Sequence, residues 1–403
     1  MNGKSLSANS IFIFLIFSVF ILIPGSAVGQ ETILLSYKQN FLRSDIEKKA
    51  EILMDAEFDE QAEYFLGQLY DFSLEFVLHN ADILYDDPKM INLAVISVKG
   101  AIKTNYKESI DNLWNLFILY KNSLVQTEVL SSLEILGKGN YLLSKNIVNY
   151  LNEQNRLRRS YAPVDIQTVS ACIIALEKLG NADSFTPIFN VLLIDYPGYI
   201  KEQAYNALET IPGDYRQFII DTILNDSPLE KLTAFETAIS GNRLSNVEKG
   251  QLAEITLSEI LNYIPKNNDE KLKMNSLGSK TSQILTEMQW STASSLAIRY
   301  FYKLQNDFQS GYATKEDFIK AIYFLGAMKT SETAEVAILQ LSLINAQTER
   351  TGVYDMDITL ALINILGLFG SKTAFDHLVY IDYLPYNEII LSAAKEAIER
   401  ILW

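Results

Sequence analysis

A short apolar segment that ends in leucine and glycine recurs along this chain, and its spacing restricts the fold more than any other feature. The clearest copy is Ala175–Gly180. Near copies end at Gly137, Gly326 and Gly367, and looser copies without the leucine end at Gly213 and Gly241. Apart from the longer gap between Gly241 and Gly326, consecutive copies are about 28 to 43 residues apart, which lies in the range of stacked helical repeats. We therefore predict an all-α fold, an α-solenoid built from stacked antiparallel helix pairs.

The same glycines predict turns between the repeats. Leu277–Thr281 matches Phe369–Thr373 residue for residue at four of five positions. A glycine at a helix end supplies a left-handed cap, and the Ser, Thr or Asp that follows it caps the next helix. We expect both segments to be turns of this kind.

Turns inside the repeats also resemble one another. Asp195–Tyr199 and Asp382–Tyr386 each contain an aspartate, two tyrosines and a proline. The polar composition of the stretches 152–163 and 265–275 predicts the two longest loops.

The chain is expected to fall into three regions. Residues 1–29 form a targeting segment, 30–86 an N-terminal helical cap and 87–403 the repeat array. Within the cap, Ile33–Leu84 predicts two or three amphipathic helices. Asp86-Asp87-Pro88 then ends one helix and starts another, because proline is tolerated in the first helical turn.

The first 29 residues have the pattern of a secretory signal peptide. Lys4 precedes an uncharged apolar run from Ile11 to Ile23, and Ala27-Val28-Gly29 offers small residues before a cleavage site. The run is shorter than the roughly 20 residues that span a bilayer, so an uncleaved anchor is the weaker alternative. We expect cleavage after Gly29 and an exported protein, periplasmic or extracellular, with no membrane span after cleavage.

Charge excludes some partners. The net charge is −15, and loss of Lys4 with the signal would make it −16. Nucleic-acid binding depends on neutralising phosphates, so we expect no nucleic-acid partner. Cys172 is the single cysteine, which rules out a disulfide within the chain. At 48% hydrophobic residues, the chain can bury a large core.

The repeat unit from Ala175 to Ile211 resembles a HEAT-type repeat, close to the variety found in phycobilin lyases. Its second helix carries the Ala-x-x-Ala-Leu pattern of that family as Ala204, Ala207 and Leu208. The family often has Val-Arg at the start of this helix, where this chain has Ile200-Lys201. The resemblance implies a HEAT/armadillo-like superhelix. It implies little about activity, because repeat arrays carry unrelated sites.

Residues that carry chemistry are sparse. His79 and His377 are the only histidines, and neither has a second histidine or a cysteine at metal-ligand spacing. We expect His79 to be partly buried and Cys172 to be buried and inert. Asp355 and Asp357 could bind calcium weakly, but a solvated loop is favoured. We assign no catalytic, cofactor-binding or metal-binding residue.

Two features predict a protein-binding surface, because tyrosine and arginine most often anchor interfaces. One is a basic cluster in an otherwise acidic chain, and the other is the pair of tyrosine–proline turns, which we expect to share one ridge. The alternative for each is a solvated or packing role. The candidate residues are Arg156, Arg158, Arg159, Tyr161, Tyr196, Tyr199, Tyr383 and Tyr386.

These patterns favour an exported, non-catalytic repeat protein that acts as a scaffold or adaptor for a protein partner. One alternative is a structural cell-envelope protein that self-associates. The other is an enzyme or chaperone similar to the phycobilin lyases, which would need a ligand pocket that the sequence does not reveal.

Overall fold

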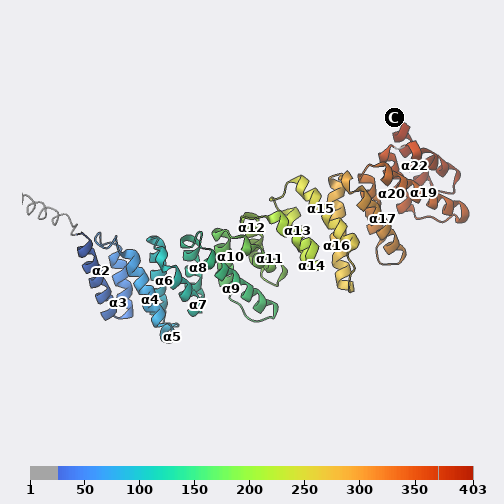
Figure 1. Cartoon of the computed structure of the whole chain (residues 1–403). Coiled ribbons are helices and arrows are strands. Elements are labelled where there is room, and N and C mark those ends of the chain that lie inside the picture. The colour runs from blue at the N-terminus through green and yellow to red at the C-terminus, as the bar shows by residue number, and fades with distance from the viewer. Residues whose placement is uncertain (1–25, 371, 403) are drawn as a thin grey trace, which may run out of the picture. The chain divides into compact units, whose positions relative to one another are not determined.

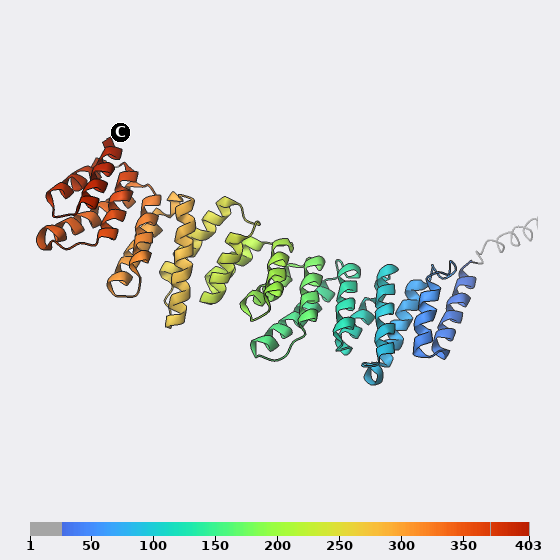
Figure 2. The ribbon, with the colours of Figure 1, turned by 180° about the vertical axis from the view of Figure 1, so that it is seen from behind.

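The computed structural model describes residues 26–370 and 372–402, and over these residues it contains helices joined by turns and loops. The predicted all-α solenoid is confirmed (Figures 1 and 2). Most of the expected targeting segment lies outside the described residues. The expected cleavage point after Gly29 falls inside helix α2.

The chain forms two compact units, and the first ends at Pro212. The helices of the first unit, with its 3-10 helices marked η, are α2 (Ser26–Arg43), α3 (Ile46–Ala56), α4 (Leu66–His79), α5 (Ala81–Leu84), α6 (Pro88–Lys103), η1 (Lys107–Ser109), α7 (Ile110–Leu119), α8 (Ser123–Leu136), α9 (Tyr141–Arg159), α10 (Ile166–Leu179), η2 (Ala182–Ser184), α11 (Phe185–Leu193) and α12 (Gly198–Thr210).

The second unit begins at Gly213. Its helices are α13 (Tyr215–Asn225), α14 (Pro228–Ser240), α15 (Asn246–Asn262), α16 (Asn268–Glu287), η3 (Ser291–Ala293), α17 (Ser294–Gln309), α18 (Lys315–Ala327), α19 (Ser331–Thr351), α20 (Met356–Phe369), η4 (Lys372–Ala374), α21 (Phe375–Val379), η5 (Tyr380–Tyr383) and α22 (Glu388–Leu402).

Each unit consists of two layers of helices. In the first unit, α6, α8, α10 and α12 form one row of neighbours, and α9 and α11 lie side by side in the other layer. In the second unit, the even-numbered helices α14 to α22 form one row, and α13, α15, α17, α19 and α21 form the other. Consecutive helices pack across the layers, so each apolar stripe is buried against its sequence neighbours.

Aspartates begin helices where the sequence predicted a break or a new repeat. Asp87 is the N-cap of α6, its side chain accepts from the Lys89 backbone N–H at 2.7 Å, and Pro88 is the first helical residue. Asp165 and Asp355 cap α10 and α20 in the same way. Such caps satisfy backbone donors that have no partner inside the helix.

The predicted turn at Leu277–Thr281 is wrong, because this segment lies within α16. Gly326 and Gly367 lie in the last turns of α18 and α20, close to the helix ends that the sequence predicted. A Cβ on Gly326 would approach Ile365 to 2.6 Å, so this glycine permits close helix packing. Gly180 and Gly370, by contrast, end helices in left-handed conformation with φ of 66° and 61°, as predicted.

The last four α-helices of the two units, α9–α12 and α19–α22, are copies of one structural module. The N-caps Asp165 and Asp355 are 190 residues apart, and the same offset joins the left-handed Gly180 and Gly370 and the short helices η2 and η4. Buried pairs at this offset are Ile200 with Ile390, Ala204 with Ala394 and Ala207 with Ala397. We call the two copies the first module and the second module.

Candidate functional site

The basic cluster lies at the end of a helix, where the sequence predicted a long loop. α9 begins at the N-cap Asn140 and continues to Arg159, so the expected loop at 152–163 is shortened to the residues that follow Arg159. The expected loop at 265–275 is likewise shorter, because α16 begins at Asn268. Arginines in the last turn of α9 are favourably placed, since the carbonyl end of a helix attracts positive charge.

The arginine cluster and the first tyrosine–proline turn meet in space. Arg158 Nε donates to the carbonyl oxygen of Asp195 at 2.9 Å, and its guanidinium carbon is 5.8 Å from the centroid of the Tyr196 ring. Arg159 Nη2 donates to Asn190 Oδ1 at 2.9 Å. We call this surface, residues 156–161 and 190–199, the basic edge.

The two tyrosines of the first turn have different environments. Tyr196 is 4% exposed, whereas Tyr199, on the first turn of α12, is 55% exposed. Burial raises the pKa of Tyr196 to about 12, against an opposing effect of the nearby Arg158 charge. Tyr196 is therefore a packing residue that holds the turn, and Tyr199 is the ring that the turn presents.

Tyr161 is the most exposed ring of the basic edge, at 92%. It follows α9 in left-handed backbone conformation, with φ of 59°. This conformation is costly for residues other than glycine. Arg156 lies beside it in sequence and pairs with Glu153, with Nε 2.7 Å from Oε2. This bond holds the pKa of the Glu153 carboxyl below its usual range.

The second tyrosine–proline turn belongs to the second module, and the sequence aligned it in the wrong register. The structural counterpart of Tyr196 is Tyr386, and each donates its backbone N–H to the carbonyl two residues earlier. Tyr386 is 7% exposed, whereas Tyr383 is 78% exposed. The prediction that all four turn tyrosines form an exposed ridge is therefore wrong for Tyr196 and Tyr386.

Beneath each turn lies a buried asparagine that the sequence reasoning missed. Asn155 Nδ2 donates to the Pro187 carbonyl at 2.9 Å, and Asn345 Nδ2 donates to the His377 carbonyl at 3.2 Å. Both pairs keep the offset of 190 residues. The sequence did contain a signal for this pair. The two asparagines are separated by the same offset as the helix caps Gly180 and Gly370.

The two modules complete this network differently. In the second module, the Tyr386 hydroxyl donates to Asn345 Oδ1 at 2.8 Å and accepts from Thr348 Oγ1 at 3.2 Å. In the first module, Asn155 Oδ1 and the Tyr196 hydroxyl are buried and have no hydrogen-bond partner among the residues that the structure describes. Arg158 occupies the position of Thr348 and reaches the turn from outside instead.

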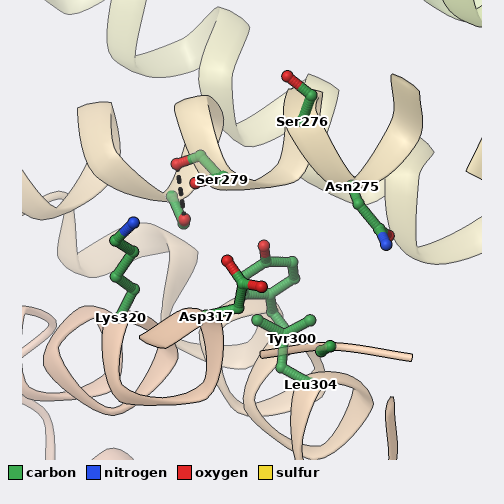
Figure 3. A pocket seen from close by; sticks show the side chains of 9 residues that line it. Asn275, Ser276, Ser279, Tyr300, Leu304, Asp317 and Lys320 are labelled. Atoms are coloured by element: carbon green, nitrogen blue, oxygen red, sulfur yellow. Dashed lines mark hydrogen bonds between the residues drawn. The ribbon is translucent and has the colours of Figure 1, made fainter. Parts of the chain in front are cut away.

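A separate pocket of about 290 Å³ lies in the second unit, between α16, α17 and α18 (Figure 3). Ser279 of α16 faces Tyr300 and Asp317 across it. Its charges are already engaged, because Asp317 Oδ2 accepts from the Thr314 hydroxyl at 2.6 Å and Lys320 pairs with Glu316 at 2.8 Å. The pocket is therefore lined by hydroxyl groups together with Asp317 and Lys320, each of which already contacts a residue of its own helix or of that helix's N-cap.

The remaining candidates for chemistry are accounted for by local structure. His79 is exposed rather than partly buried, and its Nδ1 lies 2.7 Å from the Glu75 carbonyl. Lys315 pairs with Asp355 at 3.0 Å and with Asp357 at 2.9 Å. Cys172 is buried as predicted, and burial raises the pKa of its thiol.

Within residues 26–370 and 372–402, no three histidine, cysteine or acidic side chains are grouped so that they could hold a metal ion. In the same part of the chain, no helix combines the length and the apolar character needed to cross a membrane. No protein-family model matches the chain, and no curated protein matches it.

Proposed function

We propose that the protein is an exported, non-catalytic scaffold that binds another protein through the basic edge of its first unit. The observation that carries this proposal is the pair of exposed rings, Tyr161 and Tyr199, on an ordered backbone beside three arginines. Exposed aromatic rings of this kind are the usual anchors of protein interfaces.

The contacts beneath the rings support the proposal. Arg158 ties the end of α9 to the Asp195 carbonyl, and the buried Tyr196 ring fills the space under the turn. The turn is therefore ordered before a partner arrives. Binding then costs little conformational entropy, because tyrosine has few rotatable bonds and its backbone is already fixed.

The two-layer stack of helices supports a HEAT-like assignment of the repeats. Export rests on the N-terminal pattern of the sequence. Fractionation of the native cells, followed by N-terminal sequencing of the protein, tests this part. We expect the protein in the periplasm or outside the cell with Gln30 as its first residue, and a cytoplasmic chain that still begins at Met1 would contradict export.

The binding proposal is tested by substitution of both anchor rings. A tagged chain carrying Tyr161→Ser and Tyr199→Ser should lose the protein that the wild-type chain captures from an envelope extract. Losing one well-packed anchor typically costs about 2 kcal/mol or more, so losing two should abolish capture. Helix content should stay unchanged, because neither ring is buried.

Tyr64→Ser is the matched control, since Tyr64 is 75% exposed and lies in the same unit outside the basic edge. This variant should capture the partner as well as the wild-type chain does. Unchanged capture by the folded double variant would show that the basic edge is not the binding surface.

A further inference from the structure

The two modules present the same backbone edge with opposite charge. The basic edge, residues 156–161 and 190–199, has its counterpart 190 residues later in 346–351 and 380–389, which we call the acidic edge. The basic edge contains three arginines and one aspartate. The acidic edge contains Glu349, Asp382 and Glu388 and one arginine, Arg350.

The reversal of charge is also present in one matched pair of hydrogen bonds. Arg159 donates to Asn190 Oδ1 at 2.9 Å in the first module. At the counterpart positions in the second module, the Tyr380 hydroxyl donates to Glu349 Oε1 at 2.8 Å. Arg159 and Glu349 are both exposed, so each presents its charge to solvent from the same place in its module.

From this juxtaposition we propose that the protein partner is a second copy of the same chain, whose acidic edge docks on the basic edge. The inference rests on the proposed function and names the partner of that surface. Because the modules are copies, their edges can meet about a local pseudo-two-fold axis, as in a symmetric dimer interface. Residues near that axis meet their own counterparts, and we place Arg159 and Glu349 there because both are exposed and carry opposite charges.

The charge pattern also selects against the wrong pairing. Two basic edges would place arginine against arginine, and two acidic edges would place glutamate against glutamate. Like charges across an interface weaken binding and so act as a specificity device. Elsewhere the net charge of −15 makes two copies repel each other, so the basic edge is where they can approach.

Charge reversal in the purified full chain tests the proposal, with sedimentation velocity over a concentration series as the measurement. The wild-type chain should associate, and added salt should weaken the association. Arg159→Glu alone and Glu349→Arg alone should each weaken it at least about tenfold. Mixing the two variants should restore it, because the reversed basic edge of one copy then meets the reversed acidic edge of the other with opposite charges again facing each other.

Arg43→Glu is the matched control, because Arg43 is an exposed arginine in the last turn of α2 in the same unit. It should leave association unchanged, and circular dichroism should show full helix content for all variants. A wild-type chain that stays monomeric at every concentration, or a mixture that does not recover, would overturn the inference.

Capture from the envelope extract separates this inference from the proposed function. If Arg159→Glu loses an unrelated protein while the purified chain is monomeric, the scaffold proposal stands and the second copy is not the partner. If neither self-association nor capture depends on the basic edge, the scaffold proposal and the proposal of a second copy as partner are both wrong.

Discussion

Tyr161 places an exposed ring where the backbone favours glycine. Tyr161 has φ of 59° after α9, and in the second module Gly352, one residue beyond the counterpart position of Tyr161, has φ of 67° after α19. Left-handed backbone costs a residue with a Cβ about 1–2 kcal/mol. Since the ring is 92% exposed, packing does not offset that cost, and strain at an exposed residue is a hint of function.

Tyr161→Gly should therefore be more stable than Tyr161→Ala, although alanine normally favours the folded state. Glycine avoids the left-handed strain, which stabilises the folded state by about 1–2 kcal/mol relative to alanine. Glycine also gives the unfolded chain more conformational freedom, which costs only about 0.5–1 kcal/mol of stability. Urea unfolding of both variants shows which of them has the higher free energy of unfolding. An alanine variant that is the more stable of the two would show that the backbone at this position is not strained.

The buried asparagines give a second prediction at the residue scale. Asn345→Ala removes a bond to the His377 carbonyl and a bond from the Tyr386 hydroxyl, whereas Asn155→Ala removes only the bond to the Pro187 carbonyl. A hydrogen bond contributes about 0.5–1.5 kcal/mol, so Asn345→Ala should cost about 1 kcal/mol more than Asn155→Ala. Urea unfolding measures both losses, and equal losses would mean that the Tyr386 bond contributes nothing.

At the element scale, glycines inside helices set how closely the helices pack. Gly326→Ala should lower the free energy of unfolding, because its Cβ would come within 2.6 Å of the β-branched Ile365 side chain. Overpacking of this kind typically costs about 1–3 kcal/mol. Gly198→Ala is the control, since a Cβ there meets no atom within 4 Å. Thermal unfolding of a Gly326→Ala chain at the wild-type temperature would contradict the packing role.

Helices and their starts could be predicted from the sequence, because an apolar stripe and a capping aspartate act within one turn. Asp87, Asp165 and Asp355 are examples. Helix ends could not all be predicted, because the same leucine–glycine pair closes a helix at Gly180 and lies in the middle of one at Gly278. The difference depends on a neighbouring helix that is distant in sequence.

The candidate site was predicted only in part for the same reason. The arginines and tyrosines were found by residue type, but the contact between Arg158 and the Asp195 turn joins segments 37 residues apart. Burial of Tyr196 and Tyr386 depends on which face of the turn points inward, and composition does not determine that. The offset of 190 residues between the modules sets the correct register of the two turns. Matching the turns by residue type alone gave a different register.

At the scale of the whole molecule, two compact units meet in sequence between Pro212 and Gly213. Repeat proteins are stabilised by neighbour contacts, so weakly linked parts can unfold separately. The expected division into a cap at 30–86 and an array at 87–403 stays a prediction. We expect two unfolding transitions, with the second unit the weaker, since its repeat pattern is poorest between Pro212 and Ala313.

Cys172 and Trp290 can report on the two units separately. Cys172 is buried in the first unit, and its thiol should react only after that unit opens. Trp290 donates to Glu254 Oε2 at 2.7 Å in the second unit, so its fluorescence in a variant without the other tryptophans follows that unit. The fluorescence of Trp290 should change at a lower urea concentration than the reactivity of the Cys172 thiol. Coincident curves would indicate a single cooperative unit.

Photo-crosslinking of the full chain detects directly whether the basic edge binds the acidic edge of a second copy, as we propose. A photoreactive amino acid replaces Tyr199 in the full chain, the second copy carries a heavy isotope, and mass spectrometry identifies the linked peptides. Position 64, replaced in the same way, is the control. We predict links from position 199 to residues 346–351 or 380–389 of the heavy copy, and few from position 64. Links from position 199 that stay within one chain, or that match those from position 64, would contradict the account.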